Sequence, residues 1–156
     1  MTSTKTKTHG ETSEVEKKWT KPLTEAGWTA IPSVIFERQY ALGLDPLDLN
    51  IILHLAGYWW TAGNSPHPSK KTIAAAIGVD PRTVQRRIAK MEGAGFVKRI
   101  SRLSKKGGTS TNQYSFAGLI KAATPFALER IEERKKRTAE ATERAKRKKP
   151  QLTVIK

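Results

Sequence analysis

The spacing of apolar and polar residues predicts a set of helices followed by a β-hairpin. Residues 1–18 are mostly Thr, Ser, Lys and Glu and offer little beyond Val15 to bury, so we expect a disordered arm. The stretch IPSVIFERQYALGL then predicts a leading helix, which Pro32 and Ser33 begin and Gly43 ends. This helix opens the folded part of the chain.

A second helix is predicted in LDPLDLNIILHLAGYWW, from Pro46 to about Trp60. Asp45 is suited to the N-cap, and Asp48 lies near the positive end of the helix dipole. Apolar residues fall on two sides of this helix, at about 100° per residue: Leu49, Ile52, Leu53, Ala56 and Trp60 on one, and Leu47, Ile51, Leu55 and Tyr58 on the other. We therefore expect a central helix, covered on its second side by the leading helix or by a second subunit. The second apolar side and the leading tryptophans favour a homodimer.

Two short helices follow, separated by a tight turn. Ser69 is a suitable N-cap for a helix over residues 70–77, and Gly78 can adopt the left-handed geometry that ends it. Asp80 then caps a second helix, which begins at Pro81 and ends near Gly93 and Gly95. This order of helix, three-residue turn and helix is that of a helix-turn-helix.

The next segment predicts a hairpin. FVKRISRL and QYSF are rich in apolar, β-branched and aromatic residues, and the polar, glycine-containing SKKGGTSTN lies between them. After Gly118, LIKAATPFALERI predicts a further helical segment, whereas EERKKRTAEATERAKRKK contains only alanines as apolar residues. For residues 121–156 two readings stay open, a basic helix and a disordered extension.

The distribution of charge changes this picture more than its total. The 156 residues include 29 Lys and Arg against 14 Asp and Glu, a formal charge of +15 with a pI of about 10.3. Residues 1–68 have a net charge of −1, residues 69–106 of +9, and residues 107–155 of +6. A positive charge that begins at the predicted helix-turn-helix favours a polyanionic partner, and nucleic acid above all.

The helix over residues 81–92 has two chemically different sides. Val84, Ile88 and Met91 share an apolar stripe that can anchor it to a core. The other side carries side chains that can pair with base edges in the major groove, since Arg suits guanine and Gln suits adenine. The residues that we predict to read bases are Arg82, Thr83, Gln85, Arg86 and Lys90. A solvated basic face is the alternative, but the caps, the turn and the basic hairpin in one short window favour DNA.

Other polar and basic residues lie where DNA phosphates would pass. The glycines of the hairpin tip can follow a phosphate strand, and the dipole at the start of the helix over residues 70–77 can help two lysines there. The predicted phosphate contacts are Ser69, Lys70, Lys71, Arg87, Arg99, Arg102, Lys105, Lys106 and Thr109.

Several classes of protein are disfavoured. Cysteine is absent, which excludes disulfides and thiolate catalysis, and fits a reducing cytoplasm. His9, His54 and His67 lack a metal-binding spacing, and no phosphate-binding loop or nucleophile elbow occurs. The most apolar stretch, residues 51–60, is too short to cross a bilayer. We therefore expect no enzyme, no metal, no cofactor and no membrane partner.

A resemblance to a known family supports this interpretation. SKKTIAAAIGVDPRTVQRRIAKMEGAGFVKR resembles the winged helix-turn-helix domains of bacterial, phage and plasmid regulators and replication initiators, with Ala74, Gly78 and Val84 at recurring positions. The likeness covers residues 27–118, including IPSVIFERQYALGLDPLDLNIILHL. It implies a three-helix winged fold that binds duplex DNA sequence-specifically. By the same resemblance, the reading contacts are Arg82, Thr83, Gln85 and Arg86.

Together these observations predict a mainly α protein with a small β-hairpin, a winged helix-turn-helix with flexible basic N- and C-terminal extensions. The expected parts are a disordered arm over 1–18, a DNA-binding domain over 19–120 and a tail over 121–156. We expect a cytoplasmic transcriptional regulator of a bacterium or mobile element, associated with the nucleoid or a plasmid, with double-stranded DNA as its partner. The alternatives are a plasmid or phage replication or segregation accessory protein, and a winged helix that binds RNA or protein.

Overall fold

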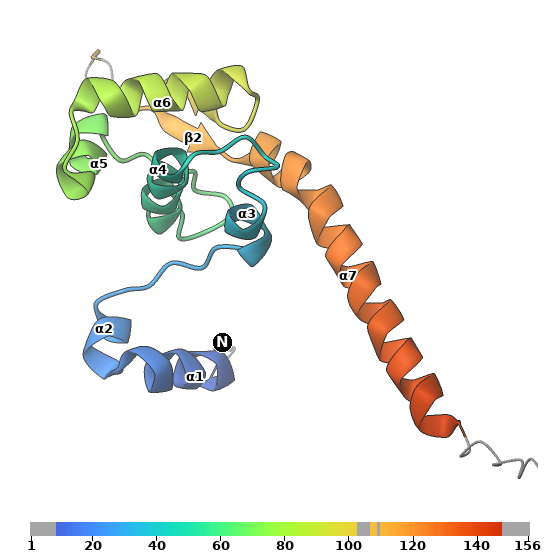
Figure 1. Ribbon diagram of the computed structural model, residues 1–156. Helices are drawn as coiled ribbons and strands as arrows, with labels where there is room; N and C mark the ends of the chain where they lie inside the picture. The colour runs from blue at the N-terminus through green and yellow to red at the C-terminus, as the bar shows by residue number, and fades with distance from the viewer. Residues whose placement is uncertain (1–8, 103–106, 109, 148–156) are drawn as a thin grey trace, which may run out of the picture.

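The computed structural model describes residues 9–102, 107–108 and 110–147. A compact body contains four helices and a hairpin: α3 (Ser33–Glu37), α4 (Pro46–Gly57), α5 (Lys70–Ile77), α6 (Pro81–Gly93), β1 (Lys98–Ile100) and β2 (Gln113–Ser115). Two N-terminal helices precede it, and a long C-terminal helix leaves it (Figure 1). The predicted fold, mainly helical with one antiparallel hairpin, is confirmed.

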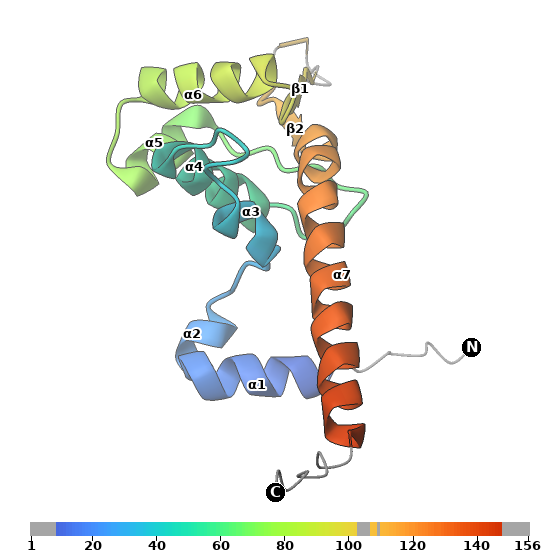
Figure 2. The ribbon, with the colours of Figure 1, turned by 45° about the vertical axis from the view of Figure 1, so that its right-hand side comes forward.

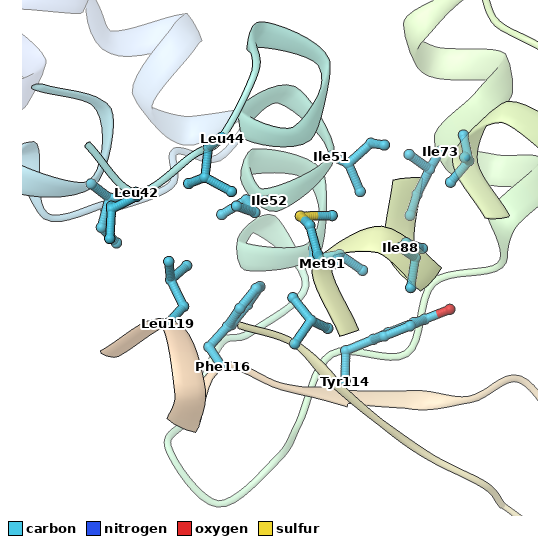
Figure 3. Close-up of a cluster of buried hydrophobic side chains, with 14 of the residues drawn as sticks. Leu42, Leu44, Ile51, Ile52, Ile73, Ile88, Met91, Tyr114, Phe116 and Leu119 are labelled. Atoms are coloured by element: carbon cyan, nitrogen blue, oxygen red, sulfur yellow. The ribbon is translucent and has the colours of Figure 1, made fainter. Parts of the chain in front are cut away.

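One hydrophobic core holds the body together. Its buried side chains come from every element of the body except β1, and Figure 3 shows how they converge. The central helix α4 contributes Ile51, Ile52 and Leu55, each at most 1% exposed. Burying an aliphatic side chain of this size stabilises a fold by about 1.5–3 kcal/mol. Helix α4 also contacts α5 and α6, so it occupies the central position that we predicted.

The hairpin extends the helix-turn-helix. β1 and β2 pair antiparallel, with Arg99 opposite Tyr114. The Tyr114 side chain is 2% exposed, and its backbone N–H donates to the carbonyl oxygen of Pro66 at 2.9 Å. The hairpin is thus attached to the core through β2, while all three residues of β1 are exposed.

Two helices are shorter than predicted. The leading helix ends at Glu37, and the chain continues through turns to Gly43, whose φ is 70°. The central helix ends at Gly57 rather than near Trp60. The following tryptophans leave the helix because they find other contacts: the Trp59 ring lies 5.7 Å from the Phe116 ring, and Trp60 Nε1 donates to the Gly57 carbonyl at 2.7 Å.

We expected a disordered arm over residues 1–18; residues 9–18 are helical instead, and residues 1–8 lie outside the described residues. Helix α1 covers His9–Trp19 and α2 covers Lys21–Glu25. Short-range ion pairs support them, between Glu14 and Lys17 and between Lys21 and Glu25. Both views show these helices set apart from the body (Figures 1 and 2).

The C-terminal segment adopts the helical alternative over residues 121–146, and residues 148–156 lie outside the described residues. Helix α7 runs over Ala117–Lys146. Its first turns pack into the core through Leu119 and Ala123, and it then leaves the body on the side away from α6 (Figure 2). No helix in the described ranges is both long and apolar enough to span a membrane.

Candidate nucleic-acid interface

The turn between α5 and α6 has the local geometry that its residues predict. The Ser69 hydroxyl accepts a hydrogen bond from the Thr72 backbone N–H at 3.0 Å, which caps α5. Gly78 ends that helix with a φ of 80°, in the left-handed region. The Asp80 carboxylate accepts from the Arg82 backbone N–H at 2.7 Å and caps α6. Each of these interactions is local, so residue types alone were enough to predict them.

Helix α6 is anchored by one side, as predicted. Val84, Ile88 and Met91 are at most 1% exposed and pack against α4 and α5. Figure 3 shows Ile88 and Met91 within the core. Because side chains three and four residues apart share a helix face, this burial turns the opposite side of α6 to solvent.

Arg82, Gln85 and Arg86 lie on that solvent-facing side, and all three are exposed. Among the described residues, no carboxylate lies within ion-pair distance of either arginine. Gln85 accepts a hydrogen bond from Lys70 Nζ at 3.2 Å, so α5 contributes a cation beside the α6 face. Thr83 is half-buried and accepts a long contact of 3.4 Å from Arg86. Four of the five residues that we predict to read bases are therefore adjacent: Arg82, Thr83, Gln85 and Arg86.

The exception is Lys90. We predicted Lys90 for base reading and Arg87 for phosphate contact, but both side chains meet carboxylates of α4 and its cap. Lys90 Nζ lies 3.1 Å from Asp45 Oδ2 and 3.1 Å from Asp48 Oδ2. Arg87 forms an ion pair with Asp45 and lies 3.5 Å from Asp48 Oδ1. We call these four residues the carboxylate clamp, because it joins the start of α4 to α6.

Asp48 is the buried member of the carboxylate clamp. Its side chain is 0% exposed, and one of its oxygens also accepts the Asp45 backbone N–H at 3.1 Å. The sequence predicts only an N-cap role for Asp45 and an interaction with the helix dipole for Asp48, because nothing in it indicates which helix faces them. The clamp neutralises positive charge beside the exposed arginines and joins α6 to the start of α4.

The ionic environment of the clamp is reflected in its pKa values. Hydrogen bonds from Lys90 and then Arg87 lower the pKa of Asp45 below its usual value. The hydrogen bond with Asp45 raises the pKa of Arg87, and hydrogen bonds with Asp45 and then Asp48 raise the pKa of Lys90. All of these directions favour the charged pairs.

The hairpin holds a second ion pair. Arg99, predicted to contact phosphate, donates from Nε to Glu92 Oε2 at 2.6 Å, and its backbone N–H donates to Glu92 Oε1 at 3.2 Å. These contacts fasten β1 to the C-terminal end of α6. Arg102 is half-buried and has no ion pair with a described residue. The predicted tip contacts Lys105, Lys106 and Thr109 lie outside the described residues.

A groove of about 330 Å³ lies between the start of α5 and the segment that leads into β2. Ser69, Lys70 and Lys71 line one side. The other side is lined by Ser110, Thr111 and Asn112, for which the sequence alone predicts only a polar hairpin tip. Hydroxyl, amide and ammonium groups are the usual donors to phosphate oxygens. The groove continues the polar surface of α6, since Lys70 also contacts Gln85. No group of three His, Asp or Glu suited to a metal occurs within the described ranges.

Comparisons with known proteins agree with this geometry. A family described as a helix-turn-helix domain matches residues 42–97, which contain α4, α5, the turn and α6. No curated protein sequence matches the chain significantly.

Two solved structures are similar. The N-terminal domain of the DnaD protein from Geobacillus kaustophilus HTA426 has a TM-score of 0.52 and 14% identity, covering 80% of this chain and 96% of that one. A possible transcriptional regulator from Methanosarcina mazei Go1 has a TM-score of 0.43 and 18% identity, covering 69% and 84%. At this identity the first similarity supports the fold. Residues 42–97 match the model of a helix-turn-helix domain, and with the β1–β2 hairpin the chain has a winged helix-turn-helix fold.

Proposed function

We propose that this protein binds double-stranded DNA sequence-specifically and acts as a transcriptional regulator of a bacterium or mobile element. The observation that carries the proposal is the two-sided character of α6. Val84, Ile88 and Met91 hold it in the core, while Arg82, Gln85 and Arg86 face solvent. A helix of this kind fits the major groove, where arginine pairs with guanine and glutamine with adenine.

The other polar residues have supporting roles in this proposal. Ser69, Lys70 and Lys71 contact phosphate at the start of α5, together with the groove residues Ser110, Thr111 and Asn112. We keep the phosphate role predicted for four residues in the segment between β1 and β2, which we call the wing: Arg102, Lys105, Lys106 and Thr109. Arg87, Lys90 and Arg99 act indirectly, because their ion pairs hold α6 and the wing in place.

The proposal is tested by comparing base readers with a phosphate contact. Preferred sites are first selected from a library of random duplexes. Arg82→Ala and Arg86→Ala should each relax preference at one base pair by about 1–3 kcal/mol. Lys71→Ala should weaken all sequences alike and flatten the slope of log affinity against log salt by about one unit. Unchanged preference in both arginine variants would refute the role of α6.

The arrangement of selected sites along DNA separates a regulator from a replication or segregation accessory protein. A regulator is expected to protect a single operator that overlaps a promoter, whereas an accessory protein is expected to protect an array of sites. Competition between duplex DNA and structured RNA at one salt concentration tests RNA as the ligand. Protection footprints together with this competition decide among the alternatives.

The homodimer stays a prediction. A groove of about 620 Å³ near the end of α4 is lined by Trp28, Trp59 and Trp60, and Trp60 is 82% exposed. Exposed aromatic surface of this kind is typical of an interface. Sedimentation that shows only monomer at high micromolar concentration would exclude a second copy.

A further inference from the structure

The second half of α7 stands clear of the body. Arg130 pairs with Glu37 of α3, and every residue from Ile131 to Lys146 is exposed. A rise of about 1.5 Å per residue gives this exposed part a length of about 24 Å. Both views place it at the opposite end of the molecule from α6 (Figures 1 and 2). An exposed helix that packs on nothing needs another reason for its composition.

Charge is sorted around this part of the helix. At about 100° per residue, the four glutamates lie together along one side: Glu132, Glu133, Glu140 and Glu143. The stripe that begins with the core contacts Leu119, Ala123 and Phe126 continues past the body as arginine: Arg130, Arg134, Arg137 and Arg144. The same helix face is therefore apolar where it meets the body and basic where it leaves it.

Two of these arginines are available for a partner. Arg144 pairs with Glu140 at 3.3 Å, but among the described residues no carboxylate lies within ion-pair distance of Arg134 or Arg137. Their neighbours on this side of the helix include the small residues Thr138 and Ala141, and Glu133 lies at its edge, where it lines a hollow with Arg130, Arg134 and Arg137. Short side chains between arginines let a helix approach a phosphate backbone closely. We call the surface formed by Arg134, Arg137, Thr138 and Ala141 the α7 basic face.

The position of the α7 basic face decides which DNA it can reach. Arg134 lies 17 residues after the start of α7, or about 26 Å along its axis. The axis runs away from α6, so a duplex on the outer side of α6 lies at the other end of the molecule (Figure 1). We propose that the α7 basic face binds a second DNA duplex, so that one molecule bridges two DNA segments. The inference rests on the proposed function for the binding of the first duplex by α6, and on the α7 basic face for the binding of the second duplex.

A capture experiment tests the bridge. A biotinylated duplex with the selected site is immobilised, the full-length protein is bound, and retention of a fluorescent duplex of random sequence is measured. The variant Arg134→Ala with Arg137→Ala should reduce retention at least fivefold. Its affinity for the immobilised site should stay within twofold, because neither residue is near α6. Alanine keeps the helix, which circular dichroism verifies.

A matched control removes the same charge from the other side of the helix. Lys136 lies among the glutamates, and Arg147 follows the last turn near the same side. Changing both to alanine should leave retention within twofold of the wild type. Equal losses in the two variants would mean that only total charge matters and would overturn the α7 basic face. Full retention by the Arg134 and Arg137 variant would overturn it as well.

Two further measurements separate this inference from the proposed function. Loss of site preference in Arg82→Ala with Arg86→Ala tests α6, whereas weaker binding of the random duplex by the Arg134 and Arg137 variant in solution tests α7. The α7 changes should flatten the salt slope of that binding by about two units, one for each lost phosphate contact. Displacement of the second duplex by structured RNA or polyglutamate at lower concentration than by unlabelled duplex would assign the α7 basic face to that ligand and overturn DNA bridging.

Discussion

At the residue scale, the carboxylate clamp shows that a basic side chain on α6 is not automatically a DNA contact. Arg82 and Arg86 face solvent without a carboxylate partner among the described residues. Lys90, on the same helix, pairs with two carboxylates, at 3.1 Å from each. The partners are 42 and 45 residues away in sequence. The clamp therefore divides the basic residues of α6 into those that pair with carboxylates of α4 and its cap and those that face solvent.

Asp48 should matter more to stability than Asp45, because it is fully buried whereas Asp45 is 39% exposed. We expect Asp48→Asn to lower the free energy of unfolding by about 1–3 kcal/mol, since the buried negative charge that faces Lys90 and Arg87 is lost. Asp45→Asn keeps the buried partner and should cost less. Urea unfolding at neutral pH measures both, and equal costs would contradict the division between the two aspartates.

The Glu92–Arg99 pair predicts a dependence of stability on pH. The hydrogen bond from Arg99 lowers the pKa of Glu92, so its contribution is present at neutral pH and is lost as pH falls through that lowered pKa. Because both side chains are about a third exposed, Glu92→Gln should cost only about 0.2–1 kcal/mol at pH 7. The difference from the wild type should shrink as pH falls through the lowered pKa of Glu92, as urea midpoints measured from neutral to acid pH would show. A difference that persists in acid would rule out the ionic origin.

At the element scale, the turn between α5 and α6 depends on Gly78. Its φ of 80° disfavours residues with a Cβ, although an added Cβ would meet no atom within 4 Å. The cost of a substitution therefore lies in the backbone and not in packing. The geometry of this turn sets the direction in which α6 leaves α5, and therefore which side of α6 is buried.

Gly78→Ala should lower the free energy of unfolding by about 1–2 kcal/mol, the penalty for a left-handed alanine. Gly93→Ala is the matched control, because this residue lies within α6, lacks a positive φ and also has open space around it. The control should be neutral or slightly stabilising, since alanine favours a helix. Equal effects in thermal or urea unfolding would show that the turn geometry does not limit stability.

At the scale of the whole molecule, a close backbone approach adds to the core contacts that fasten α7 to the winged helix-turn-helix. A Cβ on Gly118 would overlap the carbonyl oxygen of Gly95, in the loop after α6. Beside it the Leu119 backbone N–H donates to the Phe96 carbonyl at 2.9 Å. This junction aims α7 away from α6, and the proposed bridge between two duplexes depends on it.

Gly118→Ala should therefore destabilise the protein by about 1–3 kcal/mol, the usual cost of overpacking. Gly63→Ala, where an added Cβ meets no atom within 4 Å, should change stability far less. Urea midpoints compare the two, and capture of the second duplex by the Gly118 variant should fall if α7 changes direction. A Gly118 variant as stable as the wild type would refute the close approach.

The sequence alone determined the features that depend on neighbouring residues. Ser69, Gly78 and Asp80 set the helix ends because caps and turns are local, and helix periodicity separated the apolar stripe of α6 from Arg82 and Arg86. Local patterns were less reliable where a helix competed with other contacts, so α4 ended before the tryptophan that packs on Phe116.

Only the tertiary structure decided which charges meet. Periodicity gives the side on which Arg87 and Lys90 lie, but the nearness of Asp45 and Asp48 arises from the packing of α4 against α6. The direction of α7 was likewise beyond the sequence, because it is set by the contact of Gly118 with the loop after α6. Hydrophobic burial determines which side of a helix faces the core. It does not determine which charged side chains pair between helices, because those pairs are set only once the core has formed.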